Sequence, residues 1–210
     1  MKLENLDIIL FKGKYPWYTP ARIFENVIKY FTGSEYTHVG LVLKDPTWIN
    51  PSLTGYYIWN SGTYKGGNAE DDNLVTLGVQ LNPLYEYVSN YEGDVYVRRL
   101  DMKNRQLNLH QLYGIHKEIH SAQYNTKIID WICAYFNVDR EPYKTHRFWC
   151  SAFVSYVLYK MGFFSQLINW DIVRPSFFDD EDTGGFDFSL AKSIKYERIE
   201  KLNLLSFQSS

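Results

Sequence analysis

The sequence predicts an α+β fold in which helices cover one face of an antiparallel β-sheet. Three observations indicate this class: strand-like patterns fill roughly the first hundred residues, helical periodicity dominates from about residue 104 to Gly162, and an alternating stretch returns near the end. The chain of 210 residues is long enough for one substantial core and short for two. We therefore expect a single domain over residues 1–210.

Strand and helix patterns alternate in the N-terminal part. Residues 6–13, LDIILFKG, are typical of a short buried strand ended by Gly13, and residues 21–33 carry apolar side chains at helical spacing. Residues 37–43, THVGLVL, and 56–62, YYIWNSG, are rich in β-formers and flank a loop with two prolines and a glycine. We expect these two stretches to form consecutive antiparallel strands.

The middle of the chain changes from strands to helices. The Gly- and acid-rich residues 64–73 predict an exposed loop, and strands are expected over 74–81 and 93–100. Residues 104–121 and 126–136 have helical character. The inner face of the first of these helices is expected to carry Leu107, Leu109, Leu112, Ile115 and Ile119.

The C-terminal part contains the clearest helix. Residues 150–162, CSAFVSYVLYKMG, have apolar positions at the i, i+3, i+4 spacing of a buried helix, with Gly162 at its end. Residues 173–178 and the acidic residues 179–185 are expected to form loops. The alternating residues 192–202 predict a final strand.

Composition and charge exclude several classes of protein. Twenty-two basic and 24 acidic side chains give a net charge of −2, which provides no field to attract nucleic acid or an anionic membrane. The chain shows neither a signal-peptide pattern nor a run of about 18 apolar residues, so we expect a cytoplasmic protein without a transmembrane segment. Two cysteines without metal-ligand spacing predict free thiols, no structural zinc and no bound cofactor.

Cys150 lies where a helix is expected to begin, directly after two aromatic residues. The free N–H groups and the positive dipole end of a helix N-terminus stabilise a thiolate, and they can also receive an oxyanion. The position therefore suits a nucleophile. The alternative is a buried core residue, which is the usual environment of a free cysteine and the one expected for Cys133.

A nucleophilic cysteine needs a base, and His38 is the leading candidate among five histidines. It opens the strand THVGLVL, where the backbone fixes its direction and Gly40 leaves space on the same face. If the two strands are neighbours, Asn60 can reach His38 and hold its ring, as in Cys-His-Asn enzymes. The alternatives are a structural histidine and an ordinary strand-end asparagine, and His146 is a rival base.

Two further clusters are expected to be solvated. His116 and His120 are four residues apart on a predicted helix, a spacing that can bind metal, yet HKEIH is not the H-E-x-x-H motif and no third ligand is evident. We therefore expect a solvated helix face there. The acidic residues 179–182 are expected to form a solvated loop rather than a calcium site.

Five stretches together resemble the circularly permuted branch of the NlpC/P60 papain-like superfamily, which includes YiiX-like bacterial and poxviral proteins and relatives of lecithin:retinol acyltransferase. They are LDIILFKG, YTHVGLVL, WNSG, VYVRRL and FWCSAFVSYVLYKMG, in the order typical of that branch. The resemblance implies a permuted papain-like fold with Cys150 as nucleophile, His38 as base and Asn60 as the third polar group. The chain departs from the usual pattern by having Asn60 and Ser61 in place of Glu-Ala, and Ala152 in place of a glutamate.

The resemblance predicts a cysteine hydrolase of peptidase or amidase type that acts through an acyl-enzyme on a peptide, an amide or a lipid ester. The poxviral members make a viral source, and with it a virion-associated location, compatible with the sequence. Two alternatives stay open: a lipid acyltransferase or thiol esterase of the same fold, and a catalytically silent binding module. The sequence does not predict an oligomeric state.

Overall fold

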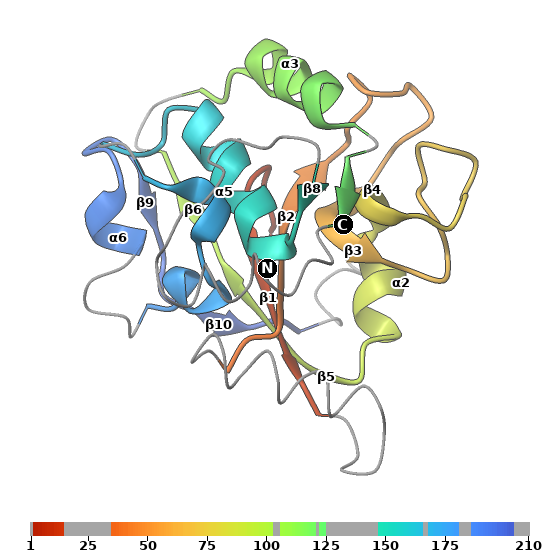
Figure 1. The fold of residues 1–210 in the computed structure, drawn as a ribbon, viewed down its shortest axis with the longest axis horizontal. Coiled ribbons are helices and arrows are strands. Elements are labelled where there is room, and N and C mark those ends of the chain that lie inside the picture. The colour runs from red at the N-terminus through yellow and green to blue at the C-terminus, as the bar shows by residue number, and fades with distance from the viewer. Residues whose placement is uncertain are drawn as a thin grey trace.

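A computed structural model describes residues 2–14, 35–102, 106–120, 122–124, 147–165, 168–180 and 186–203. Within these residues the protein is a mixed α+β structure built on an antiparallel sheet, as the sequence predicts (Figure 1). The helices predicted over residues 21–33 and 126–136 lie outside the described residues, and so do Cys133 and His146.

Eight strands of the described residues form one sheet with the order β10-β5-β1-β2-β3-β4-β7-β8. Its strands are β1 (Ile8–Gly13), β2 (His38–Lys44), β3 (Tyr56–Thr63), β4 (Leu77–Pro83), β5 (Gly93–Arg98), β7 (Gln123–Tyr124), β8 (Arg147–Phe148) and β10 (Glu200–Lys201). All neighbouring strands in this sheet are antiparallel except β7 and β8, which are parallel. The predicted pairing of the second and third strands is confirmed by the register Leu41 opposite Trp59.

Helices contact the two faces of this sheet. On one face, α5 (Cys150–Lys160) and α3 (Leu109–Ile119) pack over β2 and β3 through a large apolar cluster that includes Leu41 and Trp59. On the other face, α2 (Leu84–Ser89) contributes to a smaller cluster with Phe11 and Ile58 (Figure 1). The sequence predicted helices on one face only, because the six residues of α2 are too few to show helical periodicity.

α5 is buried on nearly all sides. Its residues from Cys150 to Leu158 are all buried, and Gly162 ends it with a φ of +70°, a conformation that glycine adopts without strain. In α3, Leu112, Ile115 and Ile119 are buried as predicted, whereas Leu109 is 42% exposed because it is the first helical residue.

Two parts of the C-terminal prediction are wrong. Residues 173–178 are not simply a loop, because Pro175–Phe178 form the 3₁₀ helix η2 after a first one, η1 (Trp170–Ile172). The expected final strand is divided into β9 (Lys195–Tyr196) and β10. β9 pairs with β6 (Leu100–Asp101) in a separate two-stranded sheet, and β10 pairs with β5.

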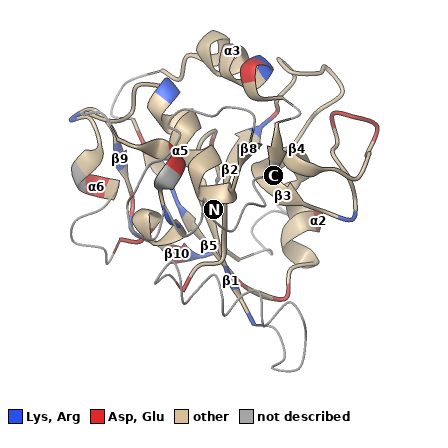
Figure 2. Cartoon of the chain, in the orientation of Figure 1, with Lys and Arg blue, Asp and Glu red and all other residues tan. Residues whose placement is uncertain are grey.

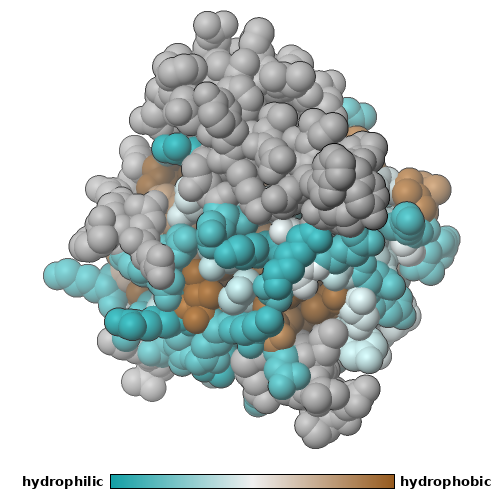
Figure 3. Space-filling view, turned by 90° about the horizontal axis from the view of Figure 1, so that it is seen from below, coloured by the Kyte–Doolittle hydropathy of each residue, from teal (hydrophilic) through white to brown (hydrophobic). Residues whose placement is uncertain are grey.

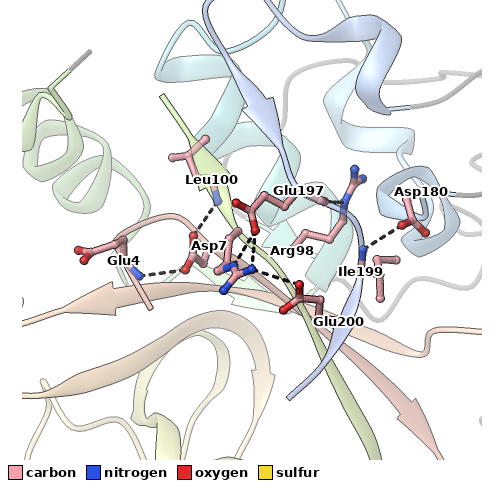
Figure 4. Close-up of polar contacts among 9 residues, drawn as sticks. Glu4, Asp7, Arg98, Leu100, Asp180, Glu197, Ile199 and Glu200 are labelled. Carbon is pink, nitrogen blue, oxygen red and sulfur yellow. Dashed lines mark hydrogen bonds and ion pairs between the residues drawn. The ribbon is translucent and has the colours of Figure 1, made fainter. Parts of the chain in front are cut away.

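Polar contacts hold the connection between β9 and β10 against the sheet (Figure 4). Arg99 forms ion pairs with Glu197 at 2.6 Å and with Glu200 at 3.1 Å. The backbone N–H of Ile199 donates to Asp180 Oδ2 at 2.9 Å. Residues 197–199 belong to neither strand, and they interrupt the alternating pattern that predicted one strand.

A buried carboxylate lies in the same region. Asp7 is 1% exposed and accepts hydrogen bonds from the backbone N–H groups of Leu100 at 2.7 Å and Glu4 at 2.9 Å (Figure 4). Burial raises the pKa of Asp7 from 3.8 to about 6, although both hydrogen bonds act in the opposite direction.

The pH dependence of stability should therefore contain a contribution from Asp7. Because its pKa is higher in the folded state, this contribution is favourable below pH 4 and is lost as the pH rises through about 6, by roughly 3 kcal/mol at about 1.4 kcal/mol per pH unit. The difference in unfolding free energy between the native chain and the Asp7→Asn variant, measured in urea, should therefore fall as the pH rises from 4 to 7. A difference that stays constant over this range would contradict the assignment.

The described surface mixes charges of both signs. Figure 2 shows basic and acidic residues on strands, helices and loops, with an acidic loop between β3 and β4. On the face seen in Figure 3, hydrophilic side chains surround small apolar areas. Among the described residues, no helix combines the length and the apolar character needed to cross a bilayer.

Candidate functional site

Cys150 is the first residue of α5, as predicted, and its side chain is buried at 5% exposure. Backbone groups of Val39, Ser151 and Cys150 itself interact with its sulfur in the sense that favours a thiolate. Burial nevertheless dominates and raises the pKa of the thiol to about 11. In this arrangement Cys150 is a neutral thiol within reach of three backbone groups.

The start of α5 is fixed by the segment that follows it. Ser151 Oγ and Trp149 Nε1 both donate to the carbonyl oxygen of Val173, at 2.7 and 3.2 Å. On the other side, the hydroxyl of Ser61 on β3 donates to the carbonyl oxygen of Phe148 at 2.7 Å. The residues on both sides of Cys150 are therefore hydrogen-bonded to other parts of the fold, which holds the sulfur in place.

His38 opens β2, as predicted, and lies close to Asn60 on β3. Its Nε2 is 3.2 Å from Asn60 Oδ1 and 3.3 Å from the hydroxyl of Tyr87 on α2. The ring also contacts Phe11, with 5.4 Å between centroids. Burial lowers the pKa of His38 from 6.5 to about 4, and the contact with Asn60 acts in the opposite direction. The imidazole is therefore neutral at physiological pH.

Two glycines leave the space that this pair of side chains occupies. A Cβ at Gly62 would lie 3.2 Å from His38 Cε1 and 3.2 Å from Asn60 Oδ1. A Cβ at Gly40 would lie 2.8 Å from Ile58 Cδ1. The expectation that Gly40 leaves space on this face is confirmed, and Gly62 has the same role next to the imidazole.

A chain of side-chain amides extends from His38 into the sheet. Asn60 Nδ2 donates to Asn82 Oδ1 at 2.9 Å, and Asn82 Nδ2 donates to the carbonyl oxygen of Gly67 at 2.7 Å. Asn60 and Asn82 are fully buried. We refer to Asn60, Asn82 and the Gly67 carbonyl as the amide relay.

The amide relay determines the protonation of the imidazole. A backbone carbonyl only accepts hydrogen bonds, so the nitrogen of Asn82 must face Gly67 and its oxygen must face Asn60. The nitrogen of Asn60 then faces Asn82, and its oxygen faces His38 as an acceptor. Nε2 of His38 therefore carries the proton, and the lone pair of a neutral imidazole is on Nδ1.

Sequence reasoning did not identify Asn82 or Tyr87. Asn82 lies on β4, directly opposite Ile58 of β3. Because side chains alternate along the strand, Gln80 and Asn82 lie on the same face of the sheet as Asn60. Two polar residues at alternate positions in an apolar strand are a signal that was available. Tyr87 had no such signal, because it lies on the unpredicted helix α2.

The structure brings His38 and Asn60 together but does not join them to Cys150 by a hydrogen bond. The sulfur belongs to the apolar cluster under α5, together with Val39, while the imidazole packs against Phe11 and Tyr87 of the cluster on the other face. Both groups adjoin the backbone at the start of β2, because Val39 directly follows His38. Comparisons of this chain with protein-family models and with curated proteins find no match.

Proposed function

We propose that this protein is a cysteine hydrolase of peptidase or amidase type with a permuted papain-like fold. The observation that carries the proposal is the position of Cys150 at the first turn of α5, where backbone groups of Val39, Ser151 and Cys150 favour its thiolate. The residue before Val39 is His38, and the amide relay leaves the lone pair of its imidazole on Nδ1. Thiol, imidazole and amide are the three groups of Cys-His-Asn hydrolases.

In the proposed reaction, the sulfur of Cys150 attacks the carbonyl carbon of an amide or ester while its proton passes to Nδ1 of His38. The carbonyl oxygen becomes an oxyanion, which the backbone N–H of Cys150 stabilises. The proton then moves from Nδ1 to the leaving group as its bond to the carbonyl carbon breaks. Water attacks the resulting thioester and gives a proton to Nδ1. This proton passes to the sulfur as the bond between sulfur and the carbonyl carbon breaks, which releases the acid and restores the thiol.

The pKa shifts support a neutral pair rather than a thiolate-imidazolium pair. Burial raises the pKa of Cys150 to about 11 and lowers that of His38 to about 4, so neither group is charged at pH 7. The proton must therefore move during the attack, as in serine hydrolases. The reaction also needs Nδ1 to move closer to the sulfur, and catalytic hydrogen bonds commonly form only once substrate is bound.

A second candidate function is a catalytically silent binding module with the same fold. It is favoured by the burial of Cys150 and by the position of the imidazole against the other apolar cluster. In that case His38 and Asn60 stabilise the sheet, and Cys150 is a core residue.

The two functions differ in the reactivity of Cys150. We expect an activated ester such as 4-nitrophenyl acetate to acylate Cys150 at pH 7 and the thioester to hydrolyse, which intact-mass spectrometry follows as a transient gain of one acetyl group. Cys150→Ala should abolish this gain, while the matched variant Cys133→Ala keeps it. Acylation of Cys150 no faster than that of free glutathione, or equal acylation of Cys150→Ala, would support the binding module instead.

A further inference from the structure

His116 of α3 and His120, the residue directly after that helix, face the acidic loop between β3 and β4. His116 Nε2 is 2.8 Å from Glu70 Oε1, and His120 Nδ1 is 3.5 Å from Glu70 Oε2. The other ring nitrogen of His120 is 3.6 Å from Asp71 Oδ1. Figure 2 shows this loop as an acidic segment next to β3 and β4.

This arrangement corrects the sequence-based expectation of a solvated helix face. His116 is buried at 4% exposure, and its ring contacts Trp59 and Trp48, with 5.7 and 6.3 Å between centroids. The group that a third ligand would require is supplied by Glu70, whose carboxylate contacts both imidazoles and which is 46 residues before His116 in the chain. Sequence reasoning missed it because only the fold brings the β3-β4 loop next to α3.

The side chains have the chemistry of a transition-metal site and lie close to the spacing that it requires. One ligand atom from each of Glu70, His116 and His120 lies within 4.8 Å of the other two. Tetrahedral zinc binds nitrogen and oxygen at about 2.0–2.1 Å, which places its ligand atoms about 3.3 Å apart. A contraction of the cluster by about 1.5 Å or less would therefore complete the geometry, and two imidazoles with a carboxylate are a usual ligand set for this ion.

A second layer of hydrogen bonds orients the acidic residues. Asn68 is 2% exposed, donates from Nδ2 to Asp71 Oδ2 at 2.7 Å, and accepts from the backbone N–H of Leu81 at 2.9 Å. One oxygen of Asp71 is thus occupied, and the other faces His120. Hydrogen-bonded carboxylates of this kind are typical of the surroundings of metal ligands.

We propose that Glu70, His116 and His120 bind a divalent cation of the zinc class, with the fourth position open to water. Asp71 faces the other ring nitrogen of His120 and orients that ring. The ion joins the β3-β4 loop to α3. Because Gly67 of the same loop ends the amide relay, the ion also holds the loop segment that orients the side chain of Asn82. The proposal does not depend on the hydrolase function.

The test measures zinc binding by isothermal titration of the reduced full chain at pH 7.5, after removal of metal with EDTA. The background carries Cys133→Ser and Cys150→Ser, so that free thiols do not bind the ion. We expect one zinc ion per chain with a dissociation constant below about 10 µM. Glu70→Gln and His120→Gln should each weaken binding at least tenfold, which is about 1.4 kcal/mol or more.

The matched control is His110→Gln, which removes an exposed histidine from the same helix and should leave the affinity unchanged. Glu70 and His120 are chosen because they are more exposed than His116, so their variants are expected to fold. Circular dichroism verifies this. Binding weaker than 10 µM, or equal binding by the native cluster and by both variants, would overturn the proposal.

Discussion

Replacing Arg98 by alanine should destabilise the protein by about 3–5 kcal/mol, through the cavity and the buried acceptors that it leaves. The guanidinium is 1% exposed and donates to four acceptors: the carbonyl oxygens of Glu197 and Phe178, each at 3.0 Å, and both oxygens of Asp187 at 2.9 Å. It also lies over the ring of Phe186, 5.4 Å from the centroid. Its removal leaves a cavity and two carbonyl groups without their donor.

Arg98→Lys is the matched variant. Lysine keeps the charge and most of the side-chain volume, but its three donors lack the planar fork that binds both oxygens of Asp187. We expect the free energy of unfolding of Arg98→Lys to lie between those of Arg98→Ala and the native chain. Urea unfolding followed by tryptophan fluorescence measures it. Destabilisation of less than 1 kcal/mol by Arg98→Ala would show that the contacts of this buried guanidinium contribute little to the fold.

Replacing His38 by alanine should slow the acylation of Cys150 by about 10²- to 10⁴-fold, the usual contribution of a general base. The measurement is single-turnover acetylation at pH 7 in the Cys133→Ala background. Tyr87→Phe is the matched control, because it removes only the hydroxyl group that is 3.3 Å from Nε2. Equal acylation rates for the native chain and His38→Ala would show that the imidazole of His38 is not the general base.

The pH profile gives an independent readout of His38. Burial keeps its folded-state pKa at about 4, so acylation should rise with pH through about 4. The same shift contributes stability that is fully present above pH 6.5 and is lost as the pH falls toward 4. His38→Gln should remove both effects. Asn60→Leu should move the rise in acylation to lower pH, because the contact with Asn60 raises the pKa of His38.

Strands and the principal helix were predictable from the sequence because their signals are local. The apolar stretch before Gly13, the alternation after His38 and the helical spacing after Cys150 each correspond to an observed element. The contact between His38 and Asn60 was predictable as well, because alternation on two neighbouring strands determines which side chains share a face.

The remaining features depend on contacts between distant parts of the chain. No local pattern indicates that Glu70 lies against His116, or that Tyr87 lies beside His38. Local patterns also did not predict the division of residues 192–202, since Glu197 and Ile199 between the two strands contact Arg99 and Asp180 from other parts of the chain. The position of Cys150 relative to the imidazole likewise depends on how α5 packs on β2, which spacing in the sequence does not define.

The amide relay has a consequence for how the imidazole responds to its surroundings. Each amide in the row is oriented by the next, so none of them can reverse alone without placing two oxygens or two NH₂ groups face to face. The row therefore reverses as a unit or not at all, and its direction is imposed by the main-chain carbonyl of Gly67 in the loop between β3 and β4. A displacement of Gly67 that reversed the row would turn the NH₂ group of Asn60 toward His38. The proton of the imidazole would then move from Nε2 to Nδ1, without any change in net charge.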